Sequence, residues 1–162
     1  MCVALAWLVL CGLLAAQTPA APKTLTVAGD VTTPLSLTLE QVRALPRAKV
    51  TVQEQGRPVV YEGVAMAELL KRAGVPMGAG MSGAALAAYV KATAADGYEV
   101  VYSIGELDPG IGDSDALVAD LVDGQPLFDY QGPFRLLMPH DKRGARSVRM
   151  LTRLDVVNLK KK

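Results

Sequence analysis

Short runs of alternating apolar and polar residues recur along the chain from residue 24 onward, and most of them end at glycine, proline or aspartate. Such alternation predicts β-strands, because successive side chains of a strand point to opposite faces. Asp96-Gly97 between two β-prone runs predicts a hairpin, and residues 48–64 predict two strands around a turn near Gly56. Further strands are expected at 24–31, 117–124, 134–139 and 153–158.

Two segments have the spacing of short helices. Thr38 is followed by Gln41 at the distance of a capping box, and Pro46 ends this first helix. The second helix would end at Gly74 and carry one apolar stripe, formed by Met66, Leu69, Leu70 and Ala73. One helical turn is expected at 147–151 and loops at 78–84 and 105–116, while residues 84–88 suit either a helix or a strand.

The order of these elements predicts the fold class. Many short strands with about two short helices in mixed order indicate an α+β domain rather than a parallel doubly wound sheet. We expect a single domain over residues 22–162, which is long enough to form a core without a metal or a disulfide.

Residues 1–21 form an apolar leader that is too short to span a bilayer comfortably. It has the features of a signal peptide, with small residues at Ala16, Ala20 and Ala21 as cleavage points, and an uncleaved anchor is the alternative. We therefore expect an exported, periplasmic protein. Cys2 and Cys11 both lie in the leader, so the mature chain would offer neither a disulfide nor a thiolate ligand.

Charge is balanced over the whole chain and segregated along it. With 17 basic and 16 acidic residues, no overall field favours nucleic acid, so no nucleic-acid partner is expected. Residues 96–129 contain nine acidic residues and no basic one, whereas 135–162 contain nine basic residues, two acidic ones and the only histidine, His140. The two segments form either solvated or paired faces, or an anion pocket.

Familiar catalytic motifs do not explain the chain. The sequence has no G-x-S-x-G nucleophile elbow and no P-loop. One histidine, with no cysteine after the leader, would leave a zinc site to be built almost entirely from carboxylates, so no metal site is expected.

The basic loop after residue 139 is the first candidate site. Arg143, Arg146 and Arg149 are spaced by three, so they would share a face on a helical turn or could converge on an anion in a loop. Backbone N–H groups around Gly144 and Ala145 could add donors. The alternative is a solvated basic edge.

The second candidate is the segment 95–109, in which aromatic and acidic residues alternate. Tyr98, Glu99 and Tyr102 are followed closely by Glu106 and Asp108. A carboxylate beside an aromatic ring suits a flat heterocycle rich in N–H groups, since the acid accepts hydrogen bonds while the ring stacks. The alternative is a hairpin turn followed by a capped helix.

Five segments, taken in order, resemble the molybdopterin-binding domain of the sulfite oxidase family. They are "LTLEQVRALP", "YEGVAMAELLKRAGV", "ADGYEVVYSIGELDP", "LVDGQPL" and "GPFRLLMPHDKRGARSVRMLTRLDVV", and they cover nearly all of the mature chain. The resemblance implies that family's mixed-sheet, barrel-like α+β fold with short helices, and a pterin pocket between loops.

The resemblance also implies roles for individual residues. The loops at 132–149 are where relatives hold pterin and phosphate, so these loops supply most of the candidates. We expect Tyr61 or Tyr98 to stack on the ligand and Glu106 or Asp108 to contact its heterocycle edge. The remaining ligand-binding candidates are His140, Asp141, Arg143, Arg146, Ser147 and Arg149.

One segment departs from the family's pattern. In catalytic relatives a cysteine thiolate ligates molybdenum just upstream of the segment that here reads "YEGV". This chain has Gln53, Glu54 and Gln55 there and no sulfur. An amide or carboxylate is a poor substitute for a thiolate on a soft metal-oxo centre, so no molybdenum is expected.

Three functional hypotheses follow. The first is a periplasmic, non-catalytic binding protein for a pterin or molybdopterin-like ligand, extended to a sensor for a membrane-bound signalling partner. The second is a molybdopterin-dependent oxidoreductase domain or subunit that binds the metal without cysteine or with a partner. The third is an interaction module in which the lysine tail, residues 160–162, docks an acidic partner or anionic lipid.

Overall fold

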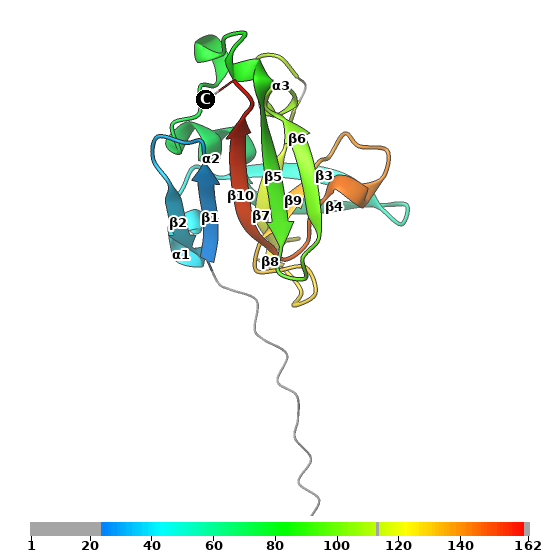
Figure 1. Ribbon diagram of the computed structural model, residues 1–162. Coiled ribbons are helices and arrows are strands. Elements are labelled where there is room, and N and C mark those ends of the chain that lie inside the picture. Colours follow the sequence, from blue (N-terminus) through cyan, green and yellow to red (C-terminus); the bar gives the residue numbers. More distant parts are fainter. Residues whose placement is uncertain (1–23, 113, 161–162) are drawn as a thin grey trace, which may run out of the picture.

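The computed structural model describes residues 24–112 and 114–160, and the expected signal peptide, with both cysteines, lies outside these ranges. The strands form two five-stranded sheets (Figure 1). The first has the order β2 (Leu35–Thr38), β1 (Thr24–Gly29), β10 (Leu151–Asn158), β5 (Ala88–Ala94) and β6 (Glu99–Ser103). The second contains β3 (Ala48–Glu54), β4 (Arg57–Ala65), β7 (Leu117–Val122) and β8 (Gln125–Pro126), with β9 (Arg135–Leu137) also paired to β7.

Both sheets are built mainly from antiparallel neighbours. In the first sheet β1 and β10 pair in parallel, and the remaining strand pairs are antiparallel. In Figure 1 the strands of the second sheet cross behind those of the first. The predicted α+β class is confirmed, and the expected barrel-like arrangement takes the form of two facing sheets.

The main core lies between the two sheets. β1, β5 and β10 contribute Leu25, Val90 and Leu154 from one side, and β4 and β7 contribute Val64 and Val118 from the other. All five side chains are fully buried. β7 is apolar on both faces, because Leu117 and Ala119 belong to a second cluster on the opposite side of the sheet, together with Val59, Tyr61, Val122 and Leu137.

The helices α1 (Leu39–Arg43) and α2 (Met66–Arg72) form as the sequence predicts. The Thr38 hydroxyl accepts a hydrogen bond from the backbone N–H of Gln41 at 3.3 Å, and the Gln41 side chain accepts one from the backbone N–H of Thr38 at 2.8 Å. The apolar stripe of α2 is fully buried, and Gly74 follows the helix with a φ of +79°. Residues 84–88 divide between a 3-10 turn (Ala85–Ala87) and the start of β5.

Two local predictions are wrong. The helical turn expected at 147–151 lies earlier, at Gly144–Arg146, and β10 begins at Leu151. This strand begins two residues before its expected start, and the backbone N–H of Leu151 donates a hydrogen bond to the Phe134 carbonyl at 2.8 Å. The loop expected at 105–116 instead begins inside a short helix, α3 (Ile104–Leu107), which Ser103 and Glu106 cap reciprocally. Among the described residues, no helix is long and apolar enough to cross a membrane.

Candidate functional site

A pocket of about 490 Å³ opens where two hairpins meet the β9–β10 loop. Figure 1 shows this loop, with its 3-10 turn, beside the β3–β4 hairpin. Side chains and backbone from four places in the sequence come together in its wall: Glu54, Gln55, Asp96, Tyr98, Arg135, Gly144, Ala145, Ser147 and Arg149.

The turns of the two hairpins place acidic residues in this wall. Gln55 and Gly56 both have positive φ, at 53° and 79°, as a two-residue turn that matches the twist of its strands requires. Glu54 is therefore the last residue of β3, directly opposite Arg57 in the ladder. The β5–β6 turn is held by Asp96, whose carboxylate accepts a hydrogen bond from the backbone N–H of Tyr98 at 3.0 Å.

Arg135 forms the floor of the pocket and is 6% exposed. Its Nη2 donates to Glu54 Oε1 at 3.1 Å, and its Nη1 donates to the Tyr61 hydroxyl and, at 3.4 Å, to Gln131 Oε1. The guanidinium also lies 4.9 Å from the centre of the Tyr61 ring. Arg135 alternates with Phe134 and Leu136, which face the main core, so its side chain lies with the second cluster.

Tyr61 completes a three-residue cluster with Glu54 and Arg135, which we call the pocket cluster. The Tyr61 hydroxyl donates to Glu54 Oε1 at 3.0 Å. Burial raises the pKa of Tyr61 to about 12, against the opposing effect of Arg135, so the hydroxyl keeps its proton at neutral pH. Arg135 Nε is buried with no partner among the described residues, an arrangement that costs about 1–3 kcal/mol.

The opposite wall is formed by the β9–β10 loop and Tyr98. The Tyr98 hydroxyl donates to the Ala145 carbonyl at 2.6 Å, which holds the half-exposed ring against the loop. Ser147 Oγ accepts a hydrogen bond from the backbone N–H of Met138 at 3.2 Å. Arg149 is exposed and lies 5.6 Å from the centre of the Tyr130 ring. Tyr98 and Arg149 therefore both contribute to the lining of the pocket.

Comparison with known proteins shows the family. The sequence profile of the oxidoreductase molybdopterin binding domain matches residues 54–162, which is more than half of the chain. The chain belongs to this family. The membership confirms the resemblance to the molybdopterin-binding domain; four of the five segments that indicated it lie within residues 54–162, and the segment at 37–46 lies before them. The membership implies a small-molecule ligand of the pterin type. No curated protein matches the chain.

A solved structure supports the same fold. Sulfane dehydrogenase SoxCD from Paracoccus pantotrophus is similar with a TM-score of 0.67 and 20% sequence identity. The similarity covers 86% of this chain and 39% of the SoxCD chain, so this molybdopterin-binding domain spans well under half of that protein.

The structure divides the predicted ligand-binding residues of the domain between two sites. Tyr98, Ser147 and Arg149 line the large pocket, and Tyr61 lies buried beneath it in contact with Arg135. A smaller pocket of about 170 Å³ contains four other candidates: Glu106, His140, Asp141 and Arg146. Arg143 is exposed and lines neither of these pockets, so the three arginines do not converge on one point.

Arg146 is the centre of the second group, which we call the loop clamp. Its guanidinium forms two bonds to Asp141, at 2.8 and 2.9 Å, and two to Glu106, at 3.1 and 3.2 Å. It lies over the Tyr102 ring at 5.6 Å, and the Tyr102 hydroxyl donates to the Arg146 carbonyl. The hydrogen bonds from Arg146 lower the pKa of Asp141, and burial raises that of Tyr102.

The candidates Asp108 and His140 have structural partners of their own. Asp108 is fully buried and accepts hydrogen bonds from the backbone N–H groups of Gly110, at 2.6 Å, and of Gly78. His140 Nε2 lies 3.3 Å from Asp115 Oδ2 at the surface.

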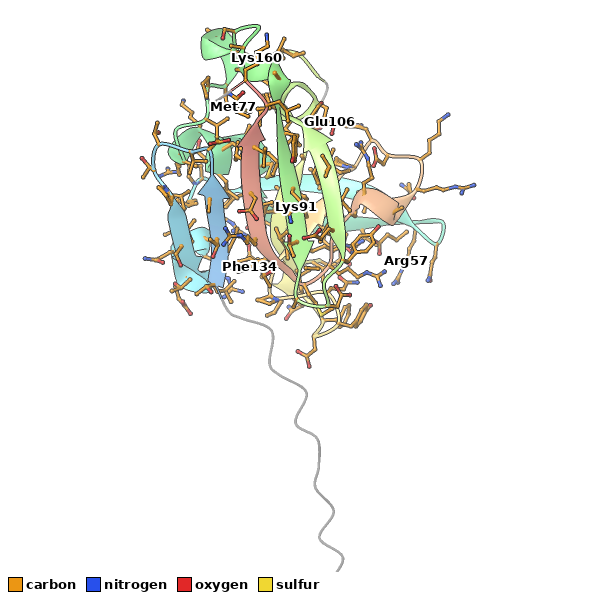
Figure 2. All side chains as sticks on the ribbon, in the orientation of Figure 1. Arg57, Met77, Lys91, Glu106, Phe134 and Lys160 are labelled. Carbon is orange, nitrogen blue, oxygen red and sulfur yellow. The ribbon has the colours of Figure 1, made fainter. Side chains whose placement is uncertain are left out.

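The loop clamp and the β3–β4 hairpin lie apart. Figure 2 shows Glu106 at the α3 end of the molecule, apart from Arg57 at the hairpin tip.

Sequence reasoning missed four pocket residues: Glu54, Gln55, Asp96 and Arg135. The first two follow from the Gln55-Gly56 turn, because a two-residue turn places the residues beside it at the hairpin end. A charged residue inside the apolar strand "FRLLMP" was also a signal, since an arginine in a core strand requires a buried partner.

The donor atoms of the pocket do not fit a thiolate-bound metal. The hairpin end carries carboxylate and amide groups, and one oxygen of Glu54 already accepts two hydrogen bonds. No cysteine occurs in 24–112 or 114–160, and within these ranges no three histidine, cysteine, aspartate or glutamate residues are grouped to hold a metal ion. The same wall fits a pterin, because it offers a ring, acidic acceptors, an arginine and the backbone of a glycine-containing turn.

Proposed function

We propose that the protein is an exported, non-catalytic binding protein for a pterin or molybdopterin-like ligand, held in the large pocket. The observation that carries the proposal is the pocket cluster, in which a carboxylate bound to Arg135 and Tyr61 stands on the segment that carries the metal-ligating thiolate in catalytic relatives. Family membership supports the class of ligand. The donor set supports binding without molybdenum.

The walls of the pocket match the two ends of such a ligand. Tyr98 offers a partly exposed ring on which a flat heterocycle can stack. Arg149, with the backbone of Gly144 and Ala145, suits a phosphate or another anionic group. Glu54 and Asp96 are acceptors for the N–H groups of the ring.

The direct test is mass spectrometry of small molecules released from gently purified protein. We expect a pteridine in near-stoichiometric amount. Recovery of no heterocycle, together with no binding of added pterins by calorimetry, would remove the proposal. The signal peptide adds a separate expectation, that the protein isolated from the periplasm lacks residues 1–21, which an intact mass measurement checks.

A sensor role is the second part of the proposal. A ligand can change the affinity for a membrane-bound partner only if it binds the two states of that complex differently. Co-purification with a membrane receptor should therefore depend on whether the pocket is filled. Identical capture by the filled and the empty protein would separate ligand binding from signalling.

The alternative function is a molybdopterin-dependent oxidoreductase domain or subunit. Membership of an oxidoreductase family and the fold shared with sulfane dehydrogenase favour it. Metal analysis of protein purified from its own compartment separates the two. The binding-protein proposal expects molybdenum far below one atom per chain and no turnover of sulfite or sulfoxides.

A further inference from the structure

Glu54 is the acidic side chain of the pocket whose position is fixed from two sides. Arg135 Nη2 and the Tyr61 hydroxyl both donate to Oε1, at 3.1 and 3.0 Å. These donors lie on different strands of the second sheet, β9 and β4, and both residues are buried. The carboxylate is therefore held in one orientation, with 36% of the side chain exposed at the pocket.

The other oxygen of this carboxylate differs from Oε1. No described residue donates a hydrogen bond to Oε2. A carboxylate oxygen only accepts hydrogen bonds, and Oε1 already has two donors. A ligand in the pocket would therefore meet an acceptor that is fixed in place and needs an N–H or O–H group.

Asp96, the other carboxylate of the pocket wall, is arranged differently. It is exposed at a hairpin turn, and its Oδ1 accepts from the backbone N–H of Tyr98. No arginine or tyrosine side chain orients it among the described residues. A carboxylate that is held in place discriminates between ligands better than a solvated one. A solvated carboxylate can rotate away from a ligand group that offers no hydrogen, whereas a fixed carboxylate cannot.

We propose that Glu54 is the specificity-determining residue of the pocket, and that its Oε2 accepts a hydrogen bond from the exocyclic amino group of the bound heterocycle. The proposal rests on the pterin-binding function proposed above and adds which residue selects the 2-amino group, the group that distinguishes pterins from other pteridines. A ring with a carbonyl at that position would place two acceptors against each other and bind more weakly.

Two commercially available heterocycles, pterin and lumazine, test this inference. Pterin carries the amino group at C2, and lumazine carries a carbonyl there on the same pteridine ring. Calorimetric titrations are made at a pH at which both rings are neutral. A hydrogen bond to a charged acceptor predicts that the wild-type protein binds pterin at least about tenfold more tightly than lumazine.

The variant Glu54→Gln keeps the size of the side chain and removes its charge. Its amide can offer either an oxygen or an NH2 group, so we expect the preference for pterin over lumazine to fall to about twofold or less. Glu62→Gln is the matched control, because Glu62 lies on the same hairpin, pairs with Lys49 and Arg47, and does not line the pocket. It should leave the tenfold preference unchanged.

The outcomes separate the two proposals. If neither heterocycle binds the wild-type protein, the pterin-binding function falls and this inference falls with it. If both bind equally well, the function stands and the role of Glu54 is overturned. If the wild-type protein prefers pterin and Glu54→Gln keeps that preference, the amino group is recognised elsewhere. Equal binding of the two heterocycles by the wild-type protein overturns the role of Glu54 even if the variant does not fold.

Discussion

The pocket cluster and the loop clamp contain the same kinds of side chain and use them differently. In the loop clamp, Arg146 forms four bonds to two carboxylates, and these groups hold the β9–β10 loop against α3 and β6. In the pocket cluster, Arg135 and Tyr61 share one oxygen of Glu54, and no described residue donates to the second oxygen, which we propose contacts the ligand. The positive charge of an arginine-rich segment therefore does not by itself identify a binding site. The bonding of each guanidinium decides its role.

The largest expected effect comes from breaking the pocket cluster at its centre. Arg135→Met leaves Glu54 and the Tyr61 hydroxyl without their cation, in a region that is partly buried. We expect a loss of about 3 kcal/mol in the free energy of unfolding, measured by urea denaturation. The double variant with Glu54→Gln should recover part of this loss. A loss below about 1 kcal/mol would show that the cluster is not a coupled unit.

Breaking the loop clamp should have a smaller effect on stability and a distinct effect on mobility. Arg146 is more exposed than Arg135, so Arg146→Ala is expected to cost about 1 kcal/mol. Hydrogen exchange should rise over residues 138–150, because the loop loses the bonds of Arg146 to Glu106 on α3 and to Asp141 within the loop. Unchanged hydrogen exchange in that segment would contradict the role of Arg146 in holding the loop.

Arg149 differs from both Arg135 and Arg146, because it lines the pocket and forms no ion pair among the described residues. Arg149→Ala should leave the unfolding free energy within about 0.5 kcal/mol and weaken binding of a phosphorylated pterin about fivefold, as measured by calorimetry. Arg153→Ala, at an exposed pair with Asp155 on β10, is the control. Equal affinities of the two variants for the phosphorylated pterin would show that Arg149 does not bind its phosphate.

The smallest expected effect is a pH dependence in the loop clamp. Arg146 lowers the pKa of Asp141 below its ordinary value of 3.8 in the folded state, so the unfolded state binds the proton first as pH falls. The stability that this pair contributes is present above about pH 4 and is lost below it. The stability difference between wild type and Asp141→Asn, under about 1 kcal/mol at pH 7, should therefore shrink toward pH 3.

Much of the fold could be predicted from local patterns. The capping box at Thr38, the apolar stripe of α2 and the turns at Gly56 and Gly97 depend on residues near in sequence, and all appear in the structure. The start of β10 could not be predicted, because bonds from Met150 and Leu151 to segments around residue 131 and Phe134 determine it.

The site was harder to predict than the fold for a related reason. Spacing by three suggested that Arg143, Arg146 and Arg149 act together. The 3-10 turn at Gly144–Arg146 and the bonds of Arg146 to Glu106, 40 residues away, separate Arg146 from the other two. Arg135 and Glu54 are 81 residues apart in the chain, and the pairing of β9 with β7, of β7 with β4 and of β4 with β3 brings them together.

Native mass spectrometry of the protein isolated from the periplasm tests the central claim most directly, since one spectrum shows the ligand and any metal on the intact chain. We predict a single added mass that matches a pteridine, with no molybdenum. A spectrum in which each chain carries one molybdenum atom would contradict the account.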